Sequence, residues 1–450
     1  MKKLYFTITI ISLLGLMTSA LLKLSYYEFK PWNVKSTIEH FSSKDFKGRL
    51  AGTESNEKVG AEIENTFKKY NLKPFEEDFN VKVPLPNDKK CSLQLLNGSA
   101  VIKNFILGED FKEDFLSFRN SSIDFSKKDR IDIYPKSFSI FKDNIEYLFY
   151  VNFDKNFSFR SSFSPNSKYG FVIEINTSTF NSLLDSLREG YTLHVDLPYS
   201  VHEEKVCNIV GKIEGSSDSL PPLILTAHYD HIGTDSLGNV YYGALDNASG
   251  ISFLLELAKS YSTLKAPKRD IIFVALNGEE IGLTGSKYFA SEYKDTLAGA
   301  EVINFDMIGV DNVPITLMSG ENSTKDSSKL LSSLENICNI KKLKFAKSYQ
   351  NSSDHAEFVN NGFDSLTISN CDLTNIHTPR DTVDKISTKA IKNTYELVRC
   401  KIIDYAYDDK SLIFYNSKTL LFFSLSSFSL VGFKLANYNN RKNTPTIYKS

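Results

Sequence analysis

The chain has 450 residues, of which 41% are hydrophobic and 24% are charged, and its formal net charge is −1. This composition is that of a globular protein, which excludes a collagen-like, coiled-coil or wholly disordered chain. The absence of a Lys and Arg surplus argues against general binding of nucleic acid. Five cysteines without a Cys-x-x-Cys spacing indicate neither a disulfide scaffold nor cysteine ligation of a metal. At ~150 residues per domain, the length predicts two to three domains.

Residues 1–22 are predicted to be a signal peptide or an N-terminal membrane anchor. Met1-Lys2-Lys3 precedes an uncharged, mostly apolar run from Leu4 to Leu22, a pattern typical of an export signal. The run is also long enough to cross a bilayer, so both alternatives stay open. Either one places the remainder of the protein outside the cytoplasm, secreted or membrane-anchored at the cell surface.

The next two segments differ in composition and in the spacing of their apolar residues. In residues 31–79, Val59, Ile63 and Phe67 recur at helical spacing and predict an N-terminal helical part of the main domain. Residues 80–200 are rich in Phe, Ser, Asn and Lys, and short alternating runs such as 169–175 predict strands. We find no catalytic constellation there and predict a separate β-rich insert.

Residues 205–408 alternate between predicted strands and helices. Apolar runs at 223–227, 271–276 and 302–305 predict strands buried on both faces. Helices are predicted between them and over 386–405. This alternation predicts an α/β fold with a mostly parallel central sheet covered by helices on both faces. Ligands of such folds bind beyond the carboxyl ends of the strands.

The last segment, 411–450, is hydrophobic and ends in a basic tail. The uncharged run 420–433 is followed by Lys434, Arg441 and Lys442, which fits a second membrane span by the positive-inside rule. The run is short against the ~20 residues that a span needs. We therefore favour a buried strand or hairpin packed on the main domain, with the second span as the alternative.

Histidines and carboxylates cluster at the predicted ends of strands and helices. The members of this cluster are His228, Asp230, Asp246, Glu279, Glu280, Asp306 and His377. Each residue taken alone has an ordinary structural explanation. The presence of all seven at one edge of the predicted sheet is not explained in this way. Charged groups there are costly unless they are paired or bound to a cation. Imidazole and carboxylate together form a ligand set suited to zinc.

Several strings around these residues carry a family resemblance. In chain order they are GRLAGTESN (48–56), TAHYDHIG (226–233), GALDNASG (243–250), NGEEIGLTGS (277–286), NFDMIG (304–309), SDHAEF (353–358) and IHTPRDT (376–382). They resemble the co-catalytic di-zinc exopeptidases of the MH clan, especially bacterial secreted aminopeptidases. That clan also includes glutamate carboxypeptidase, glutaminyl cyclase and the transferrin receptor. The insert occupies the position of the protease-associated domain of some relatives, although no motif identifies it as one.

The resemblance implies a set of metal ligands. His228 and Asp306 would hold one zinc, Glu280 and His377 would hold the other, and Asp246 would bridge both. Zinc is the expected metal, and Mn or Co can replace it in such a ligand set.

The resemblance also implies catalytic and supporting roles. Glu279 would be the general acid/base, and Asp230 would accept the second N–H of His228 and fix that ring. Tyr349 is the candidate for stabilising the tetrahedral intermediate, although its spacing to 353–355 is off by about one residue. The peptide bond between Asp246 and Asn247 would be cis, and His231 would be a local hydrogen-bond partner.

The expected function is therefore that of a zinc-dependent aminopeptidase, which removes N-terminal residues from peptides with a free N-terminus. Three alternatives within the clan remain: a carboxypeptidase, a glutaminyl-cyclase-like acyl transferase that needs one zinc, and a non-catalytic receptor-like ectodomain. The presence of all five ligand types argues against the last two. Neither the preferred N-terminal residue nor the oligomeric state follows from the sequence.

Overall fold

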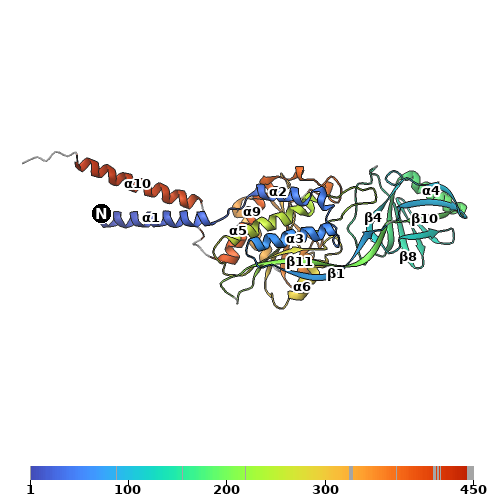
Figure 1. Cartoon of the computed structure of the whole chain (residues 1–450), viewed down its shortest axis with the longest axis horizontal. Coiled ribbons are helices and arrows are strands. Elements are labelled where there is room, and N and C mark those ends of the chain that lie inside the picture. Colours follow the sequence, from blue (N-terminus) through green and yellow to red (C-terminus); the bar gives the residue numbers. More distant parts are fainter. Residues whose placement is uncertain are drawn as a thin grey trace, which may run out of the picture.

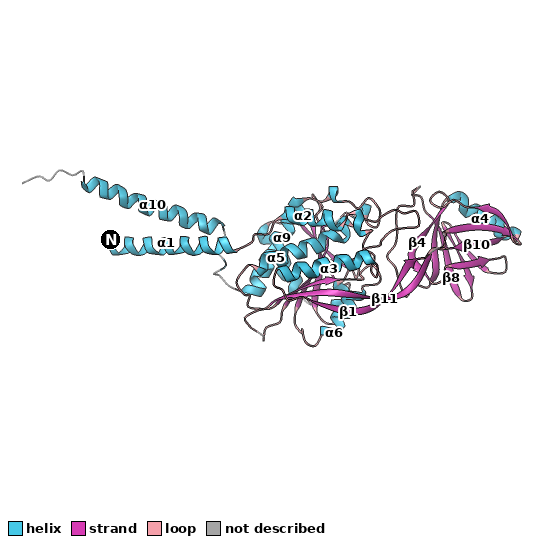
Figure 2. Cartoon of the chain, viewed as in Figure 1, coloured by secondary structure: helices cyan, strands magenta, loops and turns pink. Residues whose placement is uncertain are grey.

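A computed structural model describes residues 2–442 except 88, 155, 218, 324–327, 371, 409–411, 413, 414 and 416. Three parts follow one another along the long axis of the molecule (Figure 1). They are a pair of helices formed by α1 and α10, an α/β domain, and a β-rich domain at the opposite end. Figure 2 shows that helices dominate the first two parts and strands dominate the third.

The α/β domain is built on an eight-stranded sheet. Its order is β1 (Phe75–Pro86), β11 (Tyr199–Ile213), β13 (Ile271–Leu276), β12 (Leu223–His228), β14 (Glu301–Ile308), β17 (Asp364–Asn370), β15 (Ile315–Ser319) and β16 (Phe345–Tyr349). The central strands β13, β12, β14 and β17 are parallel, and β11 and β15 join them in antiparallel fashion. Every residue of β12 and β13 is buried, as their unbroken apolar runs predict.

Helices cover both faces of this sheet. One face carries α2 (Pro31–Phe41), α3 (Glu54–Lys69), α5 (Gly250–Ser262), α7 (Lys329–Lys341) and α9 (Thr388–Ile402). The other carries α6 (Thr284–Tyr293) and α8 (His355–Asn360). Alternate strand residues supply the two cores: Leu225 faces the first helical layer and Ile224 the second. The predicted fold class is confirmed.

Short helical turns complete the α/β domain. They are η1 (Lys44–Phe46), η2 (Ala244–Ser249), η3 (Leu373–Asn375), η4 (Val383–Lys385) and η5 (Ile403–Tyr407). Of these, η2 matters most for the site, because it lies between β12 and α5 and carries Asp246.

The insert leaves and rejoins the main sheet through one long ribbon. β1 and β11 pair antiparallel from Phe75 opposite Val210 to Pro86 opposite Tyr199, and they extend from one domain into the other. The predicted limits, 80 and 200, fall within these two strands. The β-rich part consists of two sheets and one helix around an aromatic core. Its elements are β2 (Ser92–Asn97), β3 (Ala100–Asn104), β4 (Phe111–Phe118), β5 (Ser122–Phe125), β6 (Arg130–Tyr134), β7 (Ser137–Lys142), β8 (Ile145–Val151), β9 (Tyr169–Ile175), α4 (Thr177–Glu189) and β10 (Thr192–Asp196).

The expectation for the C-terminal segment is wrong. Residues 420–433 belong neither to a strand nor to a hairpin on the main domain; they lie in α10 (Ser417–Lys442), which packs against α1 (Lys2–Ser25). A lone apolar segment without a strand partner satisfies its backbone groups within a helix. The helix extends beyond the run at both ends, and 417–436, which includes Lys418 and Lys434, is long and apolar enough to cross a membrane, as is 4–25. The tail beyond residue 442, including Lys449, lies outside the described residues.

A buried lysine fastens the insert to the α/β domain. Lys112, on β4, donates hydrogen bonds from Nζ to the carbonyl oxygen of Phe157 at 2.7 Å and to the Tyr241 hydroxyl at 2.6 Å. The same Nζ lies 3.3 Å from Asp235 Oδ2, and both side chains are fully buried. Asp235 and Tyr241 belong to the long loop after β12. The ion pair therefore joins the insert to the loop that leads into the site.

We expect Lys112→Met to destabilise the protein by about 3–5 kcal/mol, because Asp235 is then left as an uncompensated buried charge. Urea unfolding followed by tryptophan and tyrosine fluorescence measures the change. Lys103→Met is the matched control, since Lys103 lies on the exposed strand β3 of the same insert. Equal unfolding midpoints for the two variants would contradict the assigned role of the ion pair.

Candidate metal centre

The carboxyl ends of three neighbouring strands bring the predicted residues together. His228 is the last residue of β12, Glu280 follows β13 in a turn, and Asp306 lies near the end of β14. The turn after β13 requires Gly278, whose φ is +78° and whose missing Cβ would lie 2.2 Å from Thr284 Oγ1. Strand pairing thus fixes the spacing of the side chains before any of them interacts with another.

Asp246 lies between two groups of side chains and faces both. Its Oδ1 is 3.5 Å from His228 Nε2, which in turn is 3.7 Å from Asp306 Oδ1. Its Oδ2 is 3.1 Å from His377 Nε2, which lies 3.3 Å from Glu280 Oε1. The peptide bond from Asp246 to Asn247 is cis, as the resemblance implies. One carboxylate therefore belongs to both groups.

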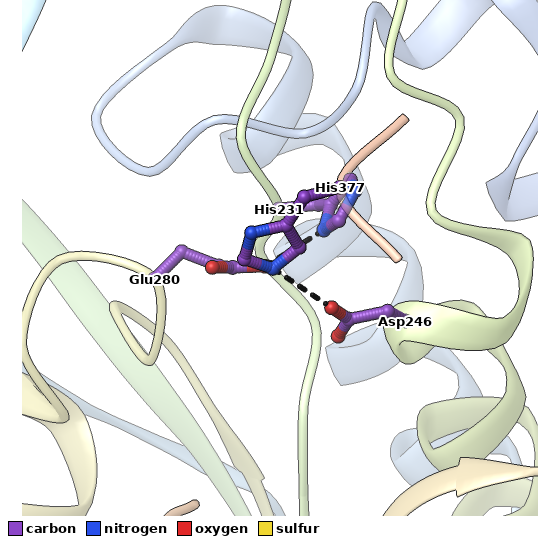
Figure 3. Close-up of side chains that lie close together, drawn as sticks. All are labelled: His231, Asp246, Glu280 and His377. Carbon is purple, nitrogen blue, oxygen red and sulfur yellow. Dashed lines mark hydrogen bonds and ion pairs between the residues drawn. The ribbon is translucent and has the colours of Figure 1, made fainter. Parts of the chain in front are cut away.

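Figure 3 shows the second group. His231, Asp246, Glu280 and His377 converge on one point from four different segments of the chain. His231 Nδ1 lies 2.8 Å from Glu280 Oε1, in line with its predicted role as a hydrogen-bond partner. His231 also offers a ring nitrogen to this group, so geometry alone makes it a candidate ligand as well.

The residues present fit metal ions. Both ring nitrogens of His228, Nε2 of His231 and Oδ1 of Asp306 are buried and lack a hydrogen-bond partner among the described residues. In each of the two groups the candidate ligand atoms lie within 4.8 Å of one another. Converging buried carboxylates repel one another unless a cation lies between them. Histidine nitrogen and carboxylate oxygen are ordinary ligands of zinc.

The electrostatics of the site reflect the same crowding. Burial raises the pKa of Glu279 well above its usual value; His228 opposes this shift, and the nearby carboxylate of Glu280 adds to it. Burial alone would lower the pKa of His377, but the carboxylates of Glu280 and Asp246 raise it well above the usual value. Burial alone would raise the pKa of Glu280, but the charge of His377 and the hydrogen bond with His231 lower it well below its usual value. The pKa values of the adjacent carboxyl groups Glu279 and Glu280 are thus shifted in opposite directions.

Two aspartates hold the backbone of the ligand loops. Asp230 accepts hydrogen bonds from the amides of Glu279 at 3.2 Å and Glu280 at 3.1 Å, and its Oδ1 lies 3.6 Å from His228 Nδ1. Asp381 accepts from the amides of Leu245 at 2.8 Å and Asp246 at 3.0 Å. The sequence singled out Asp230 but not Asp381, although Asp381 lies within the string at 376–382.

A buried arginine was also missed. Arg49 is fully buried, and its guanidinium donates to the carbonyl oxygens of Phe41, Tyr229, Tyr242 and Gly243. Burial lowers its pKa to about 10, while the charges of Asp246 and Asp381 oppose this shift. Arg49 therefore ties the N-terminal segment to the loops on both sides of the metal centre. Its place within the string at 48–56, which carries the family resemblance, was the available signal.

The insert reaches the site directly, although the sequence of 80–200 shows no catalytic constellation. Ser162 Oγ donates to Glu280 Oε2 at 2.5 Å, and the amide of Phe163 donates to the Glu280 carbonyl oxygen at 2.8 Å. The amide of Arg160 donates to the carbonyl oxygen of His377 at 3.1 Å. These contacts use backbone groups and a serine, which carry no recognisable sequence motif.

Tyr349 and His355 lie outside both ligand groups. Tyr349 ends the edge strand β16 and is 41% exposed, so its role in stabilising an intermediate stays a prediction. His355 is buried, with Nε2 3.0 Å from the Gln350 carbonyl oxygen and Nδ1 2.8 Å from Thr367 Oγ1. It is a satisfied structural histidine.

The sheet and the paired ligand groups are those of a zinc exopeptidase-like α/β domain. Residues 208–400 match the model of peptidase family M28. Aminopeptidase YwaD of Bacillus subtilis is 23% identical over 85% of this chain and 86% of its own length.

Two further comparisons cover different amounts of the chain. BSAP, a zinc aminopeptidase from Bacillus subtilis, has the same fold, with a TM-score of 0.60 at 19% identity over 85% of this chain and 97% of its own. A vacuolar membrane protease of Clavispora lusitaniae is 42% identical over 82 residues, which is 18% of this chain. The chain spans only 7% of the length of that relative.

We expect Ser162→Ala to weaken zinc binding by about 10-fold, because Glu280 loses the hydrogen bond that orients its carboxylate. Competition with a chromogenic chelator measures the affinity. Ser164→Ala is the matched control, since its amide bonds to the Leu116 carbonyl oxygen and that contact survives the substitution. An unchanged affinity in the Ser162 variant would show that the insert does not support the metal centre.

Proposed function

We propose that the protein is an extracytoplasmic, zinc-dependent aminopeptidase that removes N-terminal residues from peptides. The observation that carries this proposal is the position of Asp246, whose two oxygens lie near different histidines. A single carboxylate shared by two ligand groups suits a pair of metal ions. The match to peptidase family M28 supports peptide hydrolysis as the reaction.

His228 and Asp306 would hold one ion, Glu280 and His377 the other, and Asp246 would bridge the two. Zinc suits these ligands best, and Mn or Co can replace it. When bound, such ions polarise a carbonyl group and make water a stronger nucleophile at neutral pH. Asp230 and Asp381 keep the ligand loops in place through the backbone amides that they accept.

Glu279 would be the group that moves the proton. It adjoins Glu280 in the turn after β13, and its backbone is held by Asp230. The raised pKa of Glu279 suits a carboxylate that accepts a proton from water and then donates it to the leaving amine. Glu280 differs because its two carboxylate oxygens contact His231 and Ser162.

Two features favour action at the N-terminus of a peptide. The two ligand groups hold three carboxylates beside three histidines, and the buried carboxyl group of Glu279 lies close to them, so acidic groups are available to pair with a protonated α-amine. The insert segment around Ser162 closes against Glu280 and His377, which restricts the space for a polypeptide that continues in both directions. A chain end would enter such a site more easily than an internal segment.

The first test is hydrolysis of one peptide in two forms, with a free or an acetylated N-terminus, measured with chelator and with added zinc. We expect zinc-dependent release of the first residue from the free form only. Release from the C-terminus of both forms would identify a carboxypeptidase instead. Cyclisation of an N-terminal glutamine without hydrolysis would identify a cyclase. Binding of two zinc ions without any turnover would favour a receptor-like use of the site.

We expect Glu279→Gln to retain two zinc ions per chain and to lose turnover by about 10²–10⁴-fold, because the amide cannot accept the proton. Elemental analysis gives the metal content, and peptide hydrolysis gives the rate. Glu292→Gln, an exposed change on α6, is the control and should leave both values unchanged. Normal turnover in the Glu279 variant would remove this residue from the mechanism.

A further inference from the structure

The two terminal helices form an antiparallel pair. Ser12 Oγ of α1 lies 2.9 Å from Ser427 Oγ of α10, and the Tyr5 hydroxyl, nearer the start of α1, bonds to the Leu430 carbonyl oxygen. Gly15 packs on the ring of Phe423, where an added Cβ would lie 2.4 Å from the ring. These pairs show that the two helices run in opposite directions. The start of α1 and the end of α10 lie together, away from the α/β domain (Figure 1).

The pair has an inside and an outside of opposite character. Ser12 and Ser427 are buried between the helices, where their hydroxyl groups meet. The outer surface consists of large apolar side chains, among them Leu21, Leu425 and Phe428, which are 60%, 59% and 78% exposed. In water such a surface is unfavourable, whereas in a bilayer polar groups pair between helices and apolar groups contact lipid.

Length and charge agree with a bilayer as the partner. The apolar stretches of 22 and 20 residues each match the ~20 residues needed to cross the hydrocarbon core. Basic residues flank the ends that lie together, with no acidic residue among them: Lys2, Lys3, Lys434, Arg441 and Lys442. Such short basic flanks stay on the cytoplasmic side of a membrane.

We propose that α1 and α10 form a transmembrane hairpin, with both basic flanks in the cytoplasm and the whole peptidase on the other side. The partner of the apolar surface is then a lipid bilayer. The proposal also requires that α1 stays in the mature chain, whereas a signal peptide would be cleaved off. It resolves the two alternatives that the sequence left open at each end. It does not depend on which reaction the peptidase performs.

The connection between the hairpin and the α/β domain is short and fixed. The amide of Tyr27 donates to Thr263 Oγ1 at 2.9 Å, and the amide of Lys30 donates to Glu256 Oε1 at 2.9 Å. The Tyr27 hydroxyl also donates to Glu256 Oε1, at 2.9 Å. These bonds hold the linker after α1 against the C-terminal half of α5. The domain is therefore held at the membrane surface.

The same helix α5 sets the orientation of the active site. Its first residue, Gly250, follows the η2 segment that carries Asp246, and its last turn contacts the linker from the hairpin. Its 13 residues separate the two by about 20 Å. The metal centre thus lies at the end of α5 away from the hairpin, where Ser162 of the insert bonds to Glu280. The hairpin and the insert lie at opposite ends of the molecule (Figure 1). Peptides dissolved outside the cytoplasm would reach it without entering the membrane interface.

The test follows the topology of the full chain, translated into sealed endoplasmic-reticulum microsomes with a different epitope at each end. Asn97-Gly98-Ser99, at an exposed turn of the insert, is a natural glycosylation acceptor. We expect glycosylation of the chain, with the loss of one glycan in Asn97→Gln because other acceptors such as Asn120 and Asn156 remain, and resistance of the chain to alkaline carbonate extraction. Protease added outside the microsomes should remove both epitopes and leave the rest intact.

A double variant examines the lipid-facing surface itself. Leu425→Arg with Phe428→Arg places two charges on the outer side of α10, and we expect the C-terminal epitope to become protease-protected because α10 no longer inserts. Leu425→Ile with Phe428→Leu is the matched control and should behave as the unaltered chain. Release by carbonate, removal of α1 by signal peptidase, or a protected C-terminal epitope in the unaltered chain would each overturn the hairpin. None of these readouts depends on peptidase activity.

Discussion

The site depends on one electrostatic constraint, the convergence of buried carboxylates at one edge of the sheet. Asp246, Glu280 and Asp306 approach one another with only histidines between them. Such an arrangement is unfavourable without cations, so the surrounding structure must hold it in place. That requirement explains why Asp230, Asp381 and Arg49 form hydrogen bonds to the backbone of the loops that carry the ligands.

The supporting contacts come from segments far apart in the sequence. Arg49 lies in the N-terminal part, Ser162 in the insert and Asp381 after the last ligand. Each bonds to a loop that carries a ligand, or to the ligand itself. The metal centre is therefore assembled from three regions of the chain, and the insert is part of its wall as well as an attached domain.

The two terminal helices join the α/β domain on the side opposite the metal centre. Helix α5 links them to the site, since one end adjoins Asp246 and the other bonds to the linker after α1. A peptidase held in this way would have its position and direction relative to a bilayer fixed by the fold. The insert, at the far end, lies toward the solvent side where peptides would arrive.

The sequence by itself determined the α/β class, the central strands β12, β13 and β14, and the residues that meet at their ends. These follow from local patterns, because buried parallel strands are continuous apolar runs and the ligands stand at their ends. Only the tertiary structure decided which groups support them. Ser162 acts through a single hydroxyl, Arg160 and Phe163 act through backbone amides, and such contacts leave no pattern in sequence. The same holds for residues 420–433, whose sequence alone does not distinguish a strand from a membrane-spanning helix. In the structure they form a helix that pairs with α1, where Ser12 provides a polar partner for Ser427, 415 residues away in sequence.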